Sequence, residues 1–73
     1  MKQSGADRVF WRKQISDGDE WRVTKRRYRG IDYVSIRRFW RGRDGWFATQ
    51  QGVNFDFEWL PEIIAALELV ERS

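Results

Sequence analysis

The chain contains neither cysteine nor histidine, and in a protein of 73 residues this absence decides how the fold can be stabilised. A chain of this length makes one domain and buries only about 60% of the surface that its unfolded form exposes, so a single core is marginal. Disulfides and most structural zinc sites need the missing residues. Association with a second copy is therefore the expected support. The usual nucleophiles and bases of enzymes are missing too, so we expect no catalytic activity, no metal and no cofactor.

Apolar and aromatic residues separated by glycine-containing turns predict four β-strands. The strands are expected at residues 9–15, 21–28, 31–40 and 46–49, with turns at residues 16–19, 29–30 and 41–45. Gln50 and Gln51 are expected to lie in a solvated loop, and residues 52–55 lead from it to the helix. Residues 1–7 lack any such pattern and are predicted to be a flexible tail, which leaves residues 8–73 as one domain.

The C-terminal segment predicts a helix from residue 57 onward, with Asp56 as its N-cap. Pro61 near the start predicts a kink, or a main helix that begins at Pro61. Apolar residues cover an arc of about 160° on this helix, whereas contact with one sheet needs about 100°. The surplus predicts a homodimer that forms through the helix. The expected interface residues are Leu60, Ile63, Ile64, Leu67 and Val70, and Ala66 lies on the same arc.

Alternation along the predicted strands divides the sheet into two faces. Val34 and Ile36 point to one face, together with Val23, and this face is expected to pack under the helix. Lys25 falls among these apolar positions and does not fit there. The opposite face displays arginines and aromatic rings with little to bury them.

The positive charge is concentrated in one part of the sequence. Residues 8–43 carry 12 Lys/Arg against 4 Asp/Glu, whereas residues 55–73 carry 5 Asp/Glu against one arginine. Cations that follow the phosphate backbone and flat side chains that stack on bases are what hold single-stranded nucleic acid. We therefore predict a nucleic-acid-binding surface. Its residues are Arg22, Arg26, Tyr28, Arg29, Arg37, Arg38, Phe39, Trp40, Arg41 and Arg43, with Tyr33 and Trp46 among the rings that the face offers.

Three segments in this order resemble the transcriptional coactivator positive cofactor four family. They read VTKRRYRG at residues 23–30, YVSIRRFW at 33–40 and GVNF at 52–55, with Gly45 between the last two. The resemblance covers about residues 8–71. It implies an α+β fold, a curved four-stranded antiparallel sheet followed by one kinked helix (β-β-β-β-α), and a homodimer formed through the helices. The curved sheets of such a dimer form a groove for single-stranded or melted DNA.

The resemblance also implies roles for single residues. Tyr28 and Trp40 match stacking aromatics of the family, and Arg29 and Arg37 match its phosphate-binding cations. The chain departs from the family pattern just before Gly52, where related sequences carry a proline and two basic residues and this chain has Ala48-Thr49-Gln50-Gln51. Ile31 also stands at a position that is basic in the family, and the turn at 41–45 is one residue shorter.

The expected function is binding of single-stranded DNA with little sequence preference, in a protein of the transcription coactivator or regulator type. Two alternatives remain open: a small β module that binds RNA or duplex DNA, and an adaptor that binds proteins of the transcription machinery. No apolar run approaches the roughly 20 residues that span a membrane, and the N-terminus lacks the apolar stretch of a secretion signal. We therefore expect a cytoplasmic protein, associated with the nucleoid if the source is bacterial.

Overall fold

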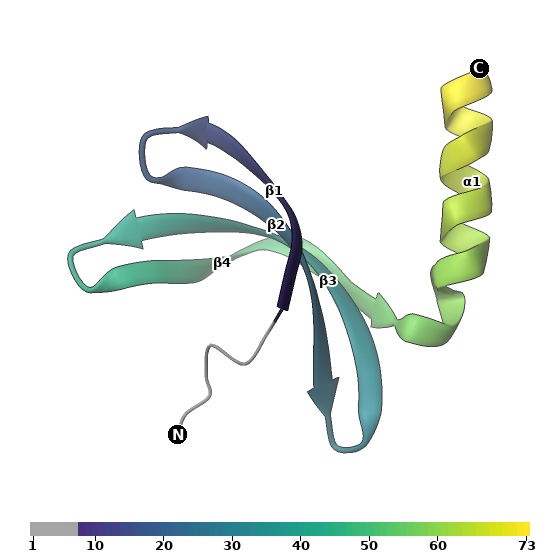
Figure 1. Cartoon of the computed structure of the whole chain (residues 1–73), viewed down its shortest axis with the longest axis horizontal. Coiled ribbons are helices and arrows are strands. Elements are labelled where there is room, and N and C mark those ends of the chain that lie inside the picture. The colour runs from purple at the N-terminus through teal and green to yellow at the C-terminus, as the bar shows by residue number, and fades with distance from the viewer. Residues whose placement is uncertain (1–7) are drawn as a thin grey trace.

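Four antiparallel strands and one C-terminal helix make up residues 8–73, the part of the chain that the computed structural model describes (Figure 1). The predicted tail at residues 1–7 lies outside the described residues. The sheet has the order β1-β2-β3-β4, so each strand pairs with its neighbour in sequence. The α+β prediction of four antiparallel strands followed by a helix is confirmed. The elements are β1 (Arg8–Ser16), β2 (Asp19–Tyr28), β3 (Ile31–Gly42), β4 (Gly45–Asp56), the 3-10 turn η2 (Phe57–Trp59) and α1 (Leu60–Arg72).

Tight turns join the strands, as the glycines predict. Arg29 and Gly30 both have positive φ angles, 54° and 80°, which is the type I′ geometry that matches the twist of a two-residue hairpin. The turn between β3 and β4 is shorter than the predicted turn at residues 41–45. Gly42 pairs with Gly45, so only two residues lie between the strands.

Strand β4 is much longer than the sequence pattern predicts, and the expectation of a loop at Gln50 and Gln51 is wrong, because both residues belong to the strand. Arg37 pairs with Gly52, and Phe39 pairs with Ala48, so a single residue of β3 lies opposite three residues of β4. This bulge breaks the alternation that marks a strand. Gly52 has a φ of 153°, and a Cβ there would collide with the carbonyl oxygen of Ile36 and lie 2.7 Å from the Cα of Arg37. The bulge therefore needs glycine at this position.

The strand register confirms two distinct faces of the sheet. Val23, Ile36 and Val53 pair across three strands and lie on one side, which we call the apolar face. Arg22 pairs with Arg37, and these side chains lie on the opposite side, the polar face.

Trp40 and Arg38 lie on the apolar face, so the expectation that they share the polar face with the other arginines is wrong. Arg38 stands two residues beyond Ile36 and Trp40 stands four, and residues at even spacing along a strand point the same way.

Helix α1 lies beside the sheet rather than over it (Figure 1), and none of its residues is buried. The prediction that the apolar face packs under the helix of the same protomer is therefore wrong. Asp56 accepts a hydrogen bond of 2.9 Å from the backbone N–H of Glu58 and caps the turn η2, which precedes the helix proper. Pro61 occupies the first turn of α1, where its missing N–H is not needed. The predicted kink is thus a 3-10 turn followed by an α-helix.

The core of the protomer is thin. Val34 is the one apolar side chain of the described residues that is buried, at 6% exposure. Lys25, which did not fit the apolar face, places its Nζ 4.3 Å from the centroid of the Phe57 ring and so covers the first residue of η2. Among residues 8–73 no helix is long and apolar enough to cross a membrane.

Candidate nucleic-acid interface

The tip of the β2–β3 hairpin combines an exposed ring with an adjacent cation. Tyr28 is 61% exposed, and the guanidinium carbon of Arg29 lies 5.2 Å from the centroid of its ring. No carboxylate among the described residues pairs with Arg29. A hollow of about 330 Å³ opens beside this tip, lined by Arg26, Arg27, Tyr28, Tyr33 and Asn54. A base could stack on the ring while its phosphate meets the guanidinium.

Arg37 lies on the polar face and is held against β4. Its guanidinium donates one hydrogen bond of 3.0 Å to the carbonyl oxygen of Thr49 and another of 3.1 Å to Oδ1 of Asn54. Within residues 8–73 it has no carboxylate partner. A guanidinium has five N–H groups, so Arg37 keeps donors for a phosphate while its position is already fixed.

Arg22 is engaged inside the protomer. Its Nε donates to Oε2 of the buried Glu20 at 2.5 Å. Its guanidinium carbon lies 4.4 Å from the ring centroid of Phe39 and 4.9 Å from that of Trp46. With only 14% of its side chain exposed, Arg22 is much less available to a ligand than the sequence indicates. The contacts of Arg22 and Phe39 hold the sheet together.

Two more arginines are paired with carboxylates. Arg38 donates to both oxygens of Asp19, with a distance of 2.8 Å from Nε to Oδ1, and to Oε1 of Gln51 at 2.9 Å. These hydrogen bonds lower the pKa of Asp19, so its carboxylate stays charged and neutralises Arg38. Arg27 donates to Asp32 at 2.9 Å and lowers the pKa of that carboxyl in the same way. The sequence missed both pairs, because the partners face each other only once the register is known.

The remaining predicted residues gather around the opposite end of the sheet. Trp40 is 51% exposed, and its ring centroid lies 5.5 Å from that of Phe47 at a tilt of 37°. Arg41 lies over the ring of Trp46 at 5.7 Å. Arg43 is exposed in the β3–β4 turn, and the described residues include no carboxylate that pairs with it.

The two rings that match the family's stacking positions are far apart in the protomer. Tyr28 pairs with Ile31, and Trp40 stands nine residues further along β3, a distance of about 30 Å at the usual rise of a strand. They also lie on opposite faces of the sheet. A ligand strand that meets both rings must therefore pass over an edge of the sheet or use rings from two protomers.

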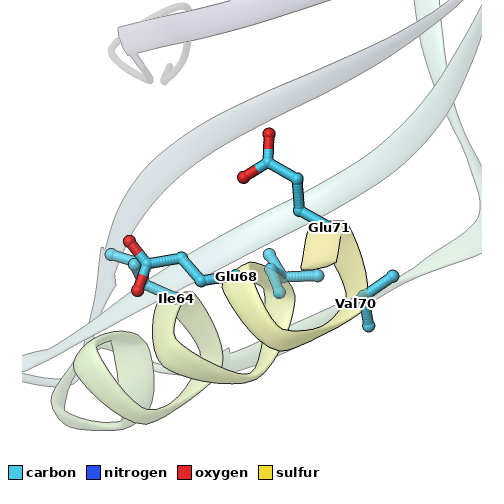
Figure 2. Close-up of a pocket in the computed structure, with 5 residues that line it drawn as sticks. Ile64, Glu68, Val70 and Glu71 are labelled. Atoms are coloured by element: carbon cyan, nitrogen blue, oxygen red, sulfur yellow. The ribbon is translucent and has the colours of Figure 1, made fainter. Parts of the chain in front are cut away.

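Helix α1 carries the predicted dimer residues, and three of them, Ile64, Leu67 and Val70, are exposed to solvent. Figure 2 shows Ile64 and Val70 around a shallow hollow, with Glu68 and Glu71 beside them. Leu67, which lines the same hollow, is 59% exposed. Leu60 and Ile63, nearer the turn η2, are half-buried. No group of three metal-ligating side chains occurs among residues 8–73.

The model of one protein family, described as Transcriptional Coactivator p15 (PC4), matches residues 15–66. The chain belongs to the PC4 family. The matched range holds β2, β3, β4 and the first half of α1, and so includes Tyr28, Arg29, Arg37 and Trp40. The expectation drawn from the three sequence segments is thereby confirmed.

Solved structures of PC4 homologues share this fold. A homologue from Burkholderia pseudomallei, in an orthorhombic crystal form, is 30% identical to the chain, covers 99% of both chains and has a TM-score of 0.77. Its tetragonal form is 28% identical over 90% of this chain and 98% of that one, with a TM-score of 0.76. A bacteriophage T5 homologue, described as implicated in recombination-dependent DNA replication, is 24% identical over 89% and 76% of the two chains, with a TM-score of 0.76. The last likeness shows the fold alone. No curated protein matches the chain.

Proposed function

We propose that this PC4 family protein binds single-stranded DNA with little sequence preference, as a homodimer and in a role of the transcription coactivator type. The observation that carries the proposal is the pairing of exposed rings with cations that no carboxylate of the described residues neutralises, above all Tyr28 with Arg29. Membership of the PC4 family supports the same conclusion.

The two kinds of side chain contribute different parts of the binding free energy. Stacking on an aromatic ring contributes about 1–3 kcal/mol per base and tolerates any base, because every base has a flat face. Arginines that meet phosphates release condensed counterions, which makes the affinity fall with salt. Bases inside a duplex are already stacked on each other, so the rings favour an unpaired strand.

The helix supports the dimer. Ile64, Leu67 and Val70 expose an apolar stripe that no other part of the described protomer covers. Removing apolar surface from water contributes about 25 cal/mol per Å². A second copy of α1 would bury the stripe of both protomers at once, and the acidic residues of the helix keep it away from a phosphate backbone.

The test is a titration of labelled single-stranded DNA with the purified protein at several salt concentrations. We expect log K to fall with log salt with a slope steeper than about −2, since each phosphate neutralised on a single strand contributes about −0.7. Unlabelled duplex DNA and RNA of the same sequence serve as competitors. Duplex or RNA competing better than single-stranded DNA would contradict the proposed ligand, and no affinity for any of the three would favour the protein-binding adaptor.

A further inference from the structure

A diagonal row of tryptophans crosses the apolar face of the sheet. Trp11 on β1 pairs with Val23, and Trp21 stands two residues from Val23 on β2. Trp21 in turn pairs with Arg38, and Trp40 stands two residues from Arg38 on β3. Each ring is therefore one strand and two residues away from the next, and all three share one face.

The spacing and exposure of this row suit a series of stacking positions. Diagonal neighbours in antiparallel strands are about 7–8 Å apart, so the three positions extend over about 15 Å. Trp11 and Trp40, at the two ends, are each 51% exposed, while Trp21 between them is half-buried. Phe47, which pairs with Trp40 and is also exposed, continues the row onto β4.

The charges along the row favour an anionic ligand. Lys13 flanks Trp21 on β1, and Arg38, whose charge Asp19 neutralises, flanks it on β3. Strand β1 contains no acidic residue, and two of its cations, Arg8 and Lys13, pair with Lys25 and Trp21 of the apolar face, whereas Arg12 lies on the polar face. Asp19 lies beside Trp40, but its carboxylate is occupied by Arg38. Cations between flat rings are the combination that a single strand needs.

We propose that the row from Trp11 through Trp21 to Trp40 is a continuous stacking track for single-stranded nucleic acid. It would extend the binding surface across the apolar face to the edge strand β1, which lies mostly outside the residues that the family model matches. This inference rests on the proposed function, since it adds subsites for the same ligand. A second copy of the chain seated on the same rings is the competing occupant.

The first test replaces Trp11, the end of the track that is furthest from Trp40. With a labelled oligothymidylate as the probe, Trp11→Leu should weaken binding about 5- to 150-fold, the equivalent of losing one stacked base at about 1–3 kcal/mol. Trp11→Phe keeps a flat ring and should retain most of the affinity. Ile15→Ala is the control, because Ile15 is a half-exposed apolar residue of the same strand without a ring. Circular dichroism checks the fold of each variant.

The second test uses two adjacent cations that point to opposite faces of β1. Lys13 pairs with Trp21 on the apolar face, whereas Arg12 pairs with Arg22 on the polar face. Lys13→Ala should make the salt slope shallower by about 0.7, the contribution of one phosphate. Arg12→Ala should leave the slope unchanged, because Arg12 is already paired with Glu20, with 3.9 Å between Nε and Oε2. Both side chains are exposed on an edge strand, so neither change threatens the fold.

The outcomes separate the track from the proposed function. If Trp11→Leu and Lys13→Ala bind like the wild type while Trp40→Leu binds weakly, the track is wrong and the proposed function stands. A change of molar mass in Trp11→Leu during light scattering would assign the row to a protein interface and overturn the track. Wild-type protein that binds no oligothymidylate would overturn both proposals. If Trp11→Leu does not fold, the salt slopes of Lys13→Ala and Arg12→Ala decide.

Discussion

The side chains of the sheet and those of the helix differ in whether they find contact partners within the same protomer. In the sheet, Arg22 and Arg38 lie against carboxylates of the same protomer, and several rings pack against guanidinium groups. In helix α1 the backbone is hydrogen-bonded and Asp56 caps the preceding turn η2, yet no side chain of the helix is buried. The sheet therefore makes most of its contacts within the protomer, whereas the helix has an apolar side without a partner there.

The charge follows the same division. The strands carry the excess of arginine, and the helix with its preceding turn carries the acidic residues Glu58, Glu62, Glu68 and Glu71. An apolar stripe edged by carboxylates suits a protein partner and repels a phosphate backbone, while cations beside exposed rings suit a nucleic acid. The comparison assigns association to the helix and ligand binding to the sheet, and each assignment can be tested separately.

The largest effect is expected from a charge placed on the helix stripe. Leu67→Glu should abolish the dimer, because a buried Leu contributes about 1.5–3 kcal/mol in each protomer and an unpaired carboxylate in an apolar interface costs more. Light scattering at micromolar concentration should give the mass of a monomer, or circular dichroism should show loss of structure.

Leu69 provides the matched control for this prediction. It is 67% exposed in the protomer, as Val70 is, but at 100° per residue it lies outside the 160° apolar arc. Leu69→Glu should therefore stay dimeric and folded. A wild-type protein that is monomeric in solution, or equal effects of the two substitutions, would contradict the assignment of association to the arc.

A smaller effect should come from the sheet and leave association intact. Trp40→Ala should weaken binding of single-stranded DNA by about 1–3 kcal/mol through loss of stacking, with the salt slope nearly unchanged. The ring is half exposed and touches Phe47 along one side, so its removal leaves no closed cavity. Fluorescence titration measures the affinity, and thermal unfolding is the control. A large loss of stability instead of affinity would show that Trp40 supports the sheet.

The contrast between the two regions also explains how much the sequence predicts. The strands β1 to β3, the two-residue hairpin at Arg29-Gly30, the cap at Asp56 and the helix all follow from local patterns. The second half of strand β4 was missed because the bulge, which needs Gly52, breaks the alternation on which strand prediction depends. The position of the helix relative to the sheet depends on the backbone path through η2, which no periodicity encodes.

The sequence predicts which residues make up the binding surface, but not how these residues are arranged and paired. The sequence gives the arginines and the rings, yet it cannot say which cations are neutralised. Asp19 and Arg38 are 19 positions apart and meet only through the β2–β3 register. Trp40 was counted among the rings of the polar face, although the alternation within β3 already places it and Arg37 on opposite sides of the sheet.

A further prediction compares a cation that is paired with one that is not. Arg29→Ala should make the salt slope shallower by about 0.7, since one phosphate contact is lost. Arg27→Ala changes the net charge by the same amount, but Arg27 is already paired with Asp32. The salt slope of the Arg27→Ala variant should therefore stay close to that of the wild type. Salt titrations of both variants provide the measurement. Equal changes would mean that the ligand responds to net charge alone and not to the arginines at the hairpin tip.

The smallest effect concerns the bulge of β4, where the chain departs from its family. Gln50 is exposed, and no hydrogen bond of its side chain is seen within the described residues, whereas Gln51 accepts a hydrogen bond from Arg38. Gln50→Lys should therefore add a cation without disturbing the Asp19–Arg38 pair. If the ligand passes the bulge beside Arg37, binding of single strands should tighten and the salt slope should steepen by about 0.7.

Gln14→Lys is the control for this last prediction, because it adds the same charge at the opposite edge of the sheet. Gln14 lies on the polar face of β1, paired with Glu20, while Gln50 lies next to Thr49, the residue whose carbonyl holds Arg37. A general electrostatic effect would steepen the slope equally in both variants. A steeper slope in Gln50→Lys alone would place the bound nucleic-acid strand along β4. The second edge of the sheet would then also bind the ligand. An unchanged slope in a folded Gln50→Lys protein would restrict the ligand to the hairpin tip and the tryptophan row.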